Sequence, residues 1–176
     1  LAARVKSVLI SCDRVVFVTE DLMEVYRNHF DFGLKGVVIA NGHNIIANSS
    51  AQYPSKEVCI RPTNVVKVKM IYLGSIGNGR DEAFDCFLTG IEKLYKETGI
   101  RVIIDIYGLE GPKTLRRFAQ YIEKGYVIFK NAIPQQEIFS TLRQYAAALQ
   151  LNARAFPFLV STKLFEYAAA KIPTIS

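Results

Sequence analysis

The stretch VKMIYLGSIGNGRDEAFDCFLTGIEKLYKETGIRVIIDIY, residues 68–107, decides the fold class. Val68–Leu73 and Arg101–Tyr107 are short, mostly apolar runs of the kind found in buried strands. Between them, Gly74–Arg80 carries three glycines, and Asp81–Thr98 places its apolar residues at helical spacing. A strand, a loop, a helix and a second strand form a right-handed βαβ unit, so this stretch predicts two parallel strands.

The same alternation continues on both sides of this unit. We predict further strands at 15–19, 36–40, 126–129, 146–151 and 173–176, and helices at 2–11, 22–30, 113–123, 134–143 and 161–170. Strands that alternate with helices in this way are typical of the α/β class. The sequence therefore predicts a Rossmann-like, doubly wound parallel sheet.

The pattern is interrupted once, over residues 48–64, where polar residues and two prolines replace it. We interpret 48–64 as a linker between the tail of one Rossmann-like domain, residues 1–47, and a second domain, residues 65–176. The last predicted strand begins at Pro173 and reaches the final residue. We therefore expect the second domain to be incomplete at its C-terminus and the chain to be part of a longer protein.

Composition restricts the class of protein further. The chain has 176 residues, of which 50% are hydrophobic and 22% charged, so it can bury a core and is neither disordered nor fibrous. It has no run of about 20 apolar residues that could cross a membrane. Its three cysteines have no C-x-x-C spacing and predict neither a disulfide framework nor a zinc site.

The net charge is +6, which favours an anionic partner. The basic residues form neither a block nor a helical stripe, which argues against nucleic acid as that partner. A small ligand that carries phosphate fits this charge, and so does loose contact with an anionic membrane surface.

The loop Gly74–Arg80 is the first candidate site. Its glycines let backbone N–H groups approach an anion, the following helix adds its positive N-terminal end, and Arg80 adds a full charge. An ordinary turn that needs positive φ would have the same composition. The glycine order is G-x-x-G-x-G, and the next strand does not end in an acidic residue, which argues against a nicotinamide dinucleotide site.

The heptapeptide STKLFEY, residues 161–167, is the second candidate site. Ser161 stands at the N-cap, and Lys163 in the first helical turn would favour a diphosphate there. Glu166 lies on the same helical face and could accept hydrogen bonds from the two hydroxyls of a ribose. The alternative is a capped helix with a Lys–Glu pair on its surface.

The longer segment STKLFEYAAAKIPTIS, residues 161–176, resembles the donor-site helix and following strand of retaining glycosyltransferases with the GT-B fold. The resemblance is to the large group that builds capsular, O-antigen and exopolysaccharide glycans. Segments upstream are similar to further parts of these enzymes in the right order: 133–137 to the base-contacting loop, 104–108 and 71–75 to the first two strands of the donor domain, and 12–19 and 38–42 to the end of the N-terminal domain.

The resemblance implies specific roles. Glu166 would bind the donor ribose, Lys163 would face the diphosphate or sugar, and Leu164 would supply a backbone N–H. Arg80 is similar to one of two basic residues in the first loop. The resemblance also places Gly74, Ser75, Gly108 and Ile133 in the loops that contact the donor.

Three positions depart from the family pattern. Phe158 stands where these enzymes have the first Glu of their donor-binding pair, and Ser75 stands where a basic residue is usual. His43 replaces the valine of the usual Asn-Gly-Val turn. Phe158 and Ser75 keep open the alternative that the donor site has decayed.

The function implied by the resemblance is transfer of a sugar from a nucleotide diphosphate-sugar to a glycan or lipid-linked acceptor. We expect a retaining, metal-independent reaction without a cofactor, in the cytoplasm or at the inner face of the membrane. No Asp-x-Asp pair occurs, and His29 and His43 lie far from acidic or cysteine clusters, so no metal is expected. The isolated chain should bind a donor without turning it over. Two alternatives remain, a nucleotide-sugar epimerase of the same fold and a non-catalytic binding or scaffold module.

Overall fold

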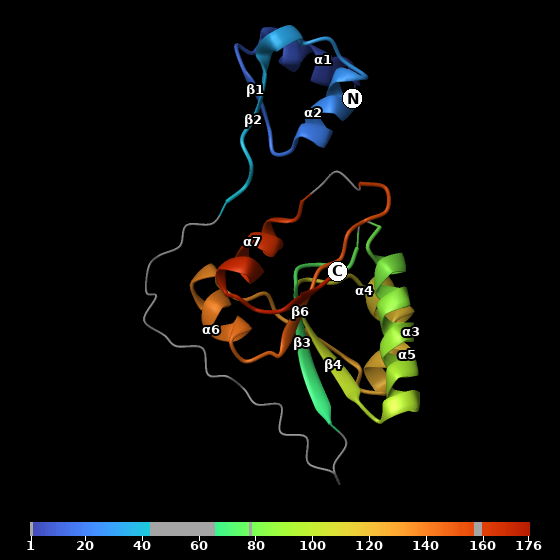
Figure 1. Cartoon of the computed structure of the whole chain (residues 1–176). Helices are drawn as coiled ribbons and strands as arrows, with labels where there is room; N and C mark the ends of the chain where they lie inside the picture. Colours follow the sequence, from blue (N-terminus) through green and yellow to red (C-terminus); the bar gives the residue numbers. More distant parts are fainter. Residues whose placement is uncertain (1, 43–65, 78, 157–159) are drawn as a thin grey trace.

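The computed structural model describes residues 2–42, 66–77, 79–156 and 160–176 (Figure 1). Its helices are α1 (Ala2–Ser11), α2 (Glu20–Arg27), α3 (Asp81–Thr98), α4 (Pro112–Arg117), α5 (Ala119–Glu123), α6 (Ile138–Leu142) and α7 (Thr162–Ala169), with short 3₁₀ helices η1 (Gly33–Lys35) and η2 (Gln135–Glu137). Its strands are β1 (Val15–Phe17), β2 (Gly36–Val38), β3 (Lys67–Leu73), β4 (Arg101–Tyr107), β5 (Val127–Lys130), β6 (Ala147–Leu149) and β7 (Thr174–Ile175). The predicted α/β class is confirmed.

Five strands form one parallel sheet in the order β5-β4-β3-β6-β7. The chain runs outward from β3 to β5 and then returns to the other side of β3 to form β6 and β7. Strand order therefore reverses between β3 and β6. In an open parallel sheet, ligands bind at such a reversal, beyond the carboxyl ends of the strands.

Helices cover both faces of this sheet (Figure 1). On one face, alternate side chains of β3 and β4 pack against α3 and α5 in a cluster that includes Met70, Tyr72, Phe84, Leu88, Ile104, Ile106 and Phe118. On the other face, the remaining side chains pack against α6 and α7 in a cluster that includes Ile71, Leu73, Leu142, Ala148 and Tyr167. Both faces are buried because the strands are apolar on both sides, as the continuous apolar runs predict.

The helix α3 and the strand β4 have the bounds that the sequence predicts. Gly99 ends α3 in the left-handed conformation, with φ at 73°, and its N–H donates to the Tyr95 carbonyl. A residue without a β-carbon adopts this conformation without strain, which explains why the helix stops there.

Two predicted helices are wrong in detail. The helix predicted at 113–123 is divided into α4 and α5, because the backbone of Phe118 leaves the helical region while its ring is fully buried against Phe84. The helix predicted at 134–143 begins later, with η2 followed by α6, because Pro134 is extended. In both places packing or proline geometry overrides a continuous helical pattern. The strands at 15–19, 36–40, 146–151 and 173–176 are also shorter than predicted.

The N-terminal residues form a smaller βαβ arrangement in which β1 and β2 pair in parallel. Thr19 is the N-cap of α2, where its hydroxyl accepts the Leu22 N–H at 3.1 Å. Leu9, Phe17, Met23 and Phe32 form a hydrophobic cluster within this segment.

The linker predicted at 48–64 lies outside the described residues, so the division into two domains stays a prediction. Among the helices that the structure describes, none is long and apolar enough to span a membrane.

Candidate functional site

A pocket of about 210 Å³ lies at the carboxyl end of the five-stranded sheet. It is lined by Leu73, Gly74, Tyr107, Ala132, Ile133, Ile138, Thr162, Lys163 and Glu166. These residues come from the ends of β3 and β4, the segment after β5, the helix α6 and the first turns of α7. The pocket therefore lies where the strand order predicts a ligand site.

The buried Tyr167 fixes α7 over the end of β3. Its side chain is fully buried, and its hydroxyl oxygen accepts the N–H of Leu73 at 3.0 Å. Burial raises the pKa of Tyr167, so the hydroxyl keeps its proton at neutral pH. This anchor positions the preceding turn of α7, which carries Lys163 and Glu166 into the pocket wall.

Lys163 lies directly over Gly74. A β-carbon built on Gly74 would be 2.5 Å from Cε and 2.9 Å from Nζ of Lys163. Gly74 also has φ at 116°, a conformation that other residues rarely adopt. The cationic head of Lys163 can therefore approach the backbone at the end of β3 only because residue 74 is glycine.

Gly108 permits a second close approach at the same end of the sheet. A β-carbon there would be 2.4 Å from the carbonyl oxygen of Gly74. The Gly74 N–H donates to the Tyr107 carbonyl at 2.8 Å, so the two strand ends are joined. Gly108 therefore packs against the loop Gly74–Arg80, which we call the first loop. It does not line the pocket.

Lys163 and Glu166 give the pocket one cationic and one anionic group. Burial lowers the pKa of Lys163, the positive charge of Arg80 lowers it further, and Glu166 opposes both effects. A half-buried ammonium group next to a second cation is stabilised by any anion that enters. The arrangement can therefore hold a phosphate group near Lys163 and a hydroxyl-bearing group near Glu166.

Several of the remaining lining residues make part of the pocket wall apolar. Ala132, Ile133 and Ile138 contribute aliphatic surface there, and Tyr107 contributes from the end of β4. A pocket with both charged and apolar lining residues suits a ligand that combines phosphate with a flat or apolar group.

The first loop is held by a carboxylate that the sequence interpretation did not single out. Glu110 accepts the Ile76 N–H through its Oε1 oxygen, and the buried hydroxyl of Tyr72 donates to the Ser75 carbonyl at 3.1 Å. Burial raises the pKa of Tyr72 to about 12. The position of Glu110 just after β4 is the signal that could have indicated it, because parallel strands end at the same edge of the sheet.

Four of the eight predicted donor-binding residues line the pocket: Gly74, Ile133, Lys163 and Glu166. Ser75 and Gly108 lie in the adjoining loops. Arg80 is the N-cap of α3, and its Nη1 donates to the Gly77 carbonyl at 3.3 Å. The Leu164 N–H donates to the Ser161 carbonyl at 3.1 Å, and its side chain is partly exposed.

Other expectations concern residues around α7 and the histidines. Ser161 occupies the N-cap position of α7 with an extended backbone, but its side chain makes no capping hydrogen bond within the described residues. Phe158 and His43 lie outside the described residues.

His29 hydrogen-bonds the Val25 carbonyl at 3.0 Å. Within the described parts of the chain, no group of three or more His, Cys, Asp or Glu side chains is arranged to hold a metal ion.

Comparison with known proteins gives a fold but no sequence family. No family model matches the chain. No curated protein matches it either. Solved structures do match it, at 14–20% sequence identity.

Three of these structures illustrate the similarity. A TarM mutant from S. aureus, in complex with fondaparinux, alpha-GlcNAc-glycerol and UDP, has a TM-score of 0.59 at 14% identity, over 98% of this chain and 32% of that one. The lipopolysaccharide outer core galactosyltransferase WaaB, in its apo form, has a TM-score of 0.56 at 20% identity, over 94% and 43%. The pneumococcal O-GlcNAc transferase GtfA, with UDP and GlcNAc, has a TM-score of 0.53 at 15% identity, over 92% and 29%.

This chain thus spans between 29% and 43% of the length of these three structures. The structural match extends over 92–98% of its own length. The fold of this chain is therefore similar to part of the GT-B fold of these glycosyltransferases.

Proposed function

We propose that this chain carries the donor site of a glycosyltransferase that uses a nucleotide diphosphate-sugar. The observation that carries the proposal is the placement of Lys163 and Glu166 on one face of α7, in a pocket at the strand-order reversal of a GT-B-type sheet. TarM and GtfA, which share the fold, were solved with UDP.

The cationic group in the pocket lining, Lys163, suits a diphosphate. Lys163 would contact it together with backbone N–H groups at the start of α7 and in the Gly74–Arg80 loop. During glycosyl transfer the diphosphate leaves with growing negative charge, and fixed positive groups in a partly dry site stabilise that charge. Arg80 would add to the field, since it already lowers the pKa of Lys163 from its position nearby.

Glu166 and the apolar lining residues of the pocket suit a nucleoside. The carboxylate of Glu166 would accept hydrogen bonds from the two ribose hydroxyls, and the segment around Ile133 would contact the base. Leu164, Ser75 and Gly108 would complete the donor-binding loops. The pocket lining thus combines a cationic, a hydroxyl-binding and an apolar group, which are the three kinds of group that the diphosphate, ribose and base of a nucleotide need.

We further propose that the reaction retains the configuration of the sugar and needs neither metal nor cofactor. The acceptor would be a glycan or a lipid-linked glycan, and the enzyme would act in the cytoplasm, with peripheral contact to anionic lipid at the inner membrane face. These proposals rest on the motif resemblance of residues 161–176 and on the net charge of +6.

The test is calorimetric titration of the chain with UDP, GDP and ADP, with NAD as a control ligand, alongside Lys163→Ala and Glu166→Gln. Saturable binding of one nucleoside diphosphate, weakened at least about tenfold in each variant, is the expected result. If the parent and both variants fold by circular dichroism and none binds, the proposal fails and the scaffold alternative replaces it. Product analysis with the matching nucleotide-sugar then separates a transferase from an epimerase.

A further inference from the structure

A buried polar cluster lies on the sheet face that carries α6 and α7. It consists of Asp105 and Tyr107 on β4, Lys130 at the end of β5, and Tyr145 after α6. The Asp105 side chain is 2% exposed, and its Oδ2 oxygen accepts hydrogen bonds from Lys130 Nζ at 2.6 Å and from the Tyr145 hydroxyl at 2.5 Å. The hydroxyls of Tyr107 and Tyr145 are 2.9 Å apart.

The hydrogen bonds in this cluster have one consistent set of directions. Tyr145 has a single proton, which it donates to Asp105, so it accepts the proton of Tyr107. Lys130 has three protons, and its Nζ is also 3.3 Å from the Tyr107 hydroxyl and 3.4 Å from that of Tyr145. Both tyrosine hydroxyls are therefore neutral donors with fixed orientations.

The cluster is costly to bury unless it is fully connected. The carboxylate of Asp105 is buried and loses its hydration, whereas the Lys130 side chain is 36% exposed. Only good geometry and further hydrogen bonds offset the loss at Asp105. The second oxygen of Asp105, Oδ1, is buried and has no hydrogen-bond partner within the described residues. The hydrogen bonds that the structure shows for this carboxylate are therefore all with members of the cluster. The hydrogen bonds that are present restrict the orientations of the side chains that they join.

The side chain that this arrangement fixes is Tyr107, which also lines the pocket. The Tyr107 and Tyr145 rings meet nearly edge to face, with centroids 6.3 Å apart, and Lys130 Nζ lies 5.1 Å from the Tyr107 ring centroid. Tyr107 is held at its hydroxyl, at its ring and, through its carbonyl bond to Gly74, at its backbone. It is the one aromatic residue among the described lining residues.

We propose that Tyr107 packs against the nucleobase of the donor and that Asp105, Lys130 and Tyr145 are positioning residues that hold it there. The inference rests on the proposed function. Lys163 and Glu166 account for the diphosphate and the ribose, and Tyr107 lines the same pocket and packs against the same hydrophobic cluster as Ile133. An aromatic side chain next to a base contributes binding that depends on the base and not on the phosphates.

The test compares UDP with ribose 5-diphosphate, which has the same ribose and diphosphate but no base. If UDP is not the nucleotide bound by the parent, the diphosphate that it does bind takes the place of UDP. Affinities are measured by calorimetry for the parent, Tyr107→Leu, Tyr107→Phe and Tyr145→Phe. A double variant, Asp105→Asn with Lys130→Met, removes both charges together, so that no unpaired charge is left in the sheet face. Tyr95→Phe, on α3, is the matched control.

We expect Tyr107→Leu to weaken UDP binding about tenfold and to leave ribose 5-diphosphate binding within about twofold of the parent. Three variants keep the Tyr107 ring but loosen it: Tyr145→Phe, Tyr107→Phe and the double variant. They should weaken UDP binding about two- to fivefold and should also leave ribose 5-diphosphate binding within about twofold of the parent. Tyr95→Phe should change neither affinity.

Two results overturn the inference in different ways. If the parent binds UDP but Tyr107→Leu changes both affinities equally, or neither, Tyr107 does not contact the base and the inference alone fails. If the parent binds no nucleoside diphosphate, the proposed function fails and the inference fails with it.

Discussion

The side chain of Lys163 crosses the backbone of Gly74, so closely that a β-carbon at residue 74 would lie 2.5 Å from Lys163 Cε. This contact joins the first turn of α7 to the end of β3. It puts the only described lysine of the pocket lining against the loop that begins the βαβ unit. The glycine and the lysine are thus one structural feature, although they are far apart in the sequence.

Gly74→Ala should therefore weaken both folding and diphosphate binding. Alanine is strained at φ 116°, and its β-carbon would displace the end of Lys163. We expect a loss of about 1–3 kcal/mol in the free energy of unfolding and at least about a tenfold loss in UDP affinity. Denaturant unfolding and calorimetry measure the two effects.

Gly77→Ala is the control in the same loop. A β-carbon on Gly77 meets nothing within 4 Å, and its φ is not in the left-handed region. Its stability should stay within about 0.5 kcal/mol of the parent. An equal loss in both variants would show that the contact with Lys163 is not the cause.

Gly108→Ala should destabilise the protein through backbone contact alone. Its β-carbon would lie 2.4 Å from the Gly74 carbonyl oxygen, and neither strand end can move without breaking the Gly74–Tyr107 hydrogen bond. We expect a loss of about 1–3 kcal/mol in the free energy of unfolding.

Gly90→Ala, inside α3, provides the opposite control for Gly108→Ala. A β-carbon there meets nothing within 4 Å. Alanine favours a helix over glycine, so this variant should gain about 0.5–1 kcal/mol. Unchanged stability of Gly108→Ala would contradict the close packing of the strand ends.

Lys163→Met should stabilise the fold while it abolishes diphosphate binding. The pKa of Lys163 is lowered by burial, so the unfolded chain binds more protons than the folded chain between the lowered pKa and the ordinary value of 10.5. The stability contributed at this position therefore falls as pH drops through that window. The advantage of Lys163→Met should be largest near neutral pH and should shrink toward pH 10.5.

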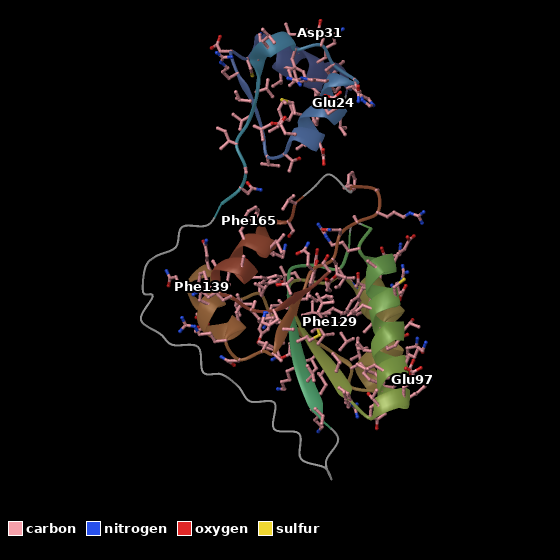
Figure 2. All side chains as sticks on the ribbon, in the orientation of Figure 1. Glu24, Asp31, Glu97, Phe129, Phe139 and Phe165 are labelled. Carbon is pink, nitrogen blue, oxygen red and sulfur yellow. The ribbon has the colours of Figure 1, made fainter. Side chains whose placement is uncertain are left out.

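Thermal unfolding across pH measures this advantage, with Lys96→Met as the control. Lys96 is exposed on α3, and Glu97, next to it in the chain, lies at the end of α3 far from α7, which carries Phe165 (Figure 2). Lys96→Met should show no such pH-dependent gain. A lower melting temperature for Lys163→Met at neutral pH would contradict the prediction.

Glu110→Gln should strengthen diphosphate binding. The carboxylate of Glu110 accepts the Ile76 N–H in the first loop, where its charge repels an incoming diphosphate. The amide oxygen of glutamine can still accept that hydrogen bond. We expect UDP affinity to rise about two- to fivefold at low salt and the gain to shrink at high salt.

Glu123→Gln, exposed at the end of α5, is the matched control for the charge removed at Glu110 and should not alter UDP affinity. Weaker binding by Glu110→Gln, measured by calorimetry, would show that the charge is needed to hold the loop.

Glu166→Gln should discriminate between ribose and its deoxy analogues. If the carboxylate accepts both ribose hydroxyls, the variant should lose about tenfold or more in affinity for UDP and little for 2′,3′-dideoxy-UDP. Competition calorimetry with the two ligands gives the ratio. Equal losses for both ligands would place Glu166 away from the ribose.

Local patterns predicted the elements with strong signals of their own. The bounds of α3 follow from an amphipathic repeat that ends at Gly99, and those of β4 follow from a mostly apolar run. The division at Phe118 did not follow from the pattern, because it depends on a ring that packs edge-on to Phe84. The late start of α6 did not follow from Pro134 alone, because proline is accepted both in the first turn of a helix and just before it.

The candidate site shows the same limit. Lys163 and Glu166 were identified because they lie one helical turn apart on a single helix, where spacing alone places them on one face. Glu110 and Tyr107 are placed by contacts with residues on distant segments, Ile76 for Glu110 and Tyr145 for Tyr107, and no local pattern signals such contacts.

The sequence by itself determined the α/β class, the parallel sheet and the helix that carries the charged pair, because periodicity and capping act over a few residues. Only the tertiary structure decided that Lys163 lies on Gly74, that Glu110 holds the first loop, and that Asp105, Lys130 and Tyr145 hold Tyr107. Those contacts join residues that are far apart in the chain: Lys130 and Tyr145 are separated by 15 positions, and Asp105 and Tyr145 by 40. Leu73 and Tyr167, whose hydrogen bond anchors α7, are separated by 94. These contacts form because the parallel strands end at one edge of the sheet, where packing rather than local sequence selects the neighbours.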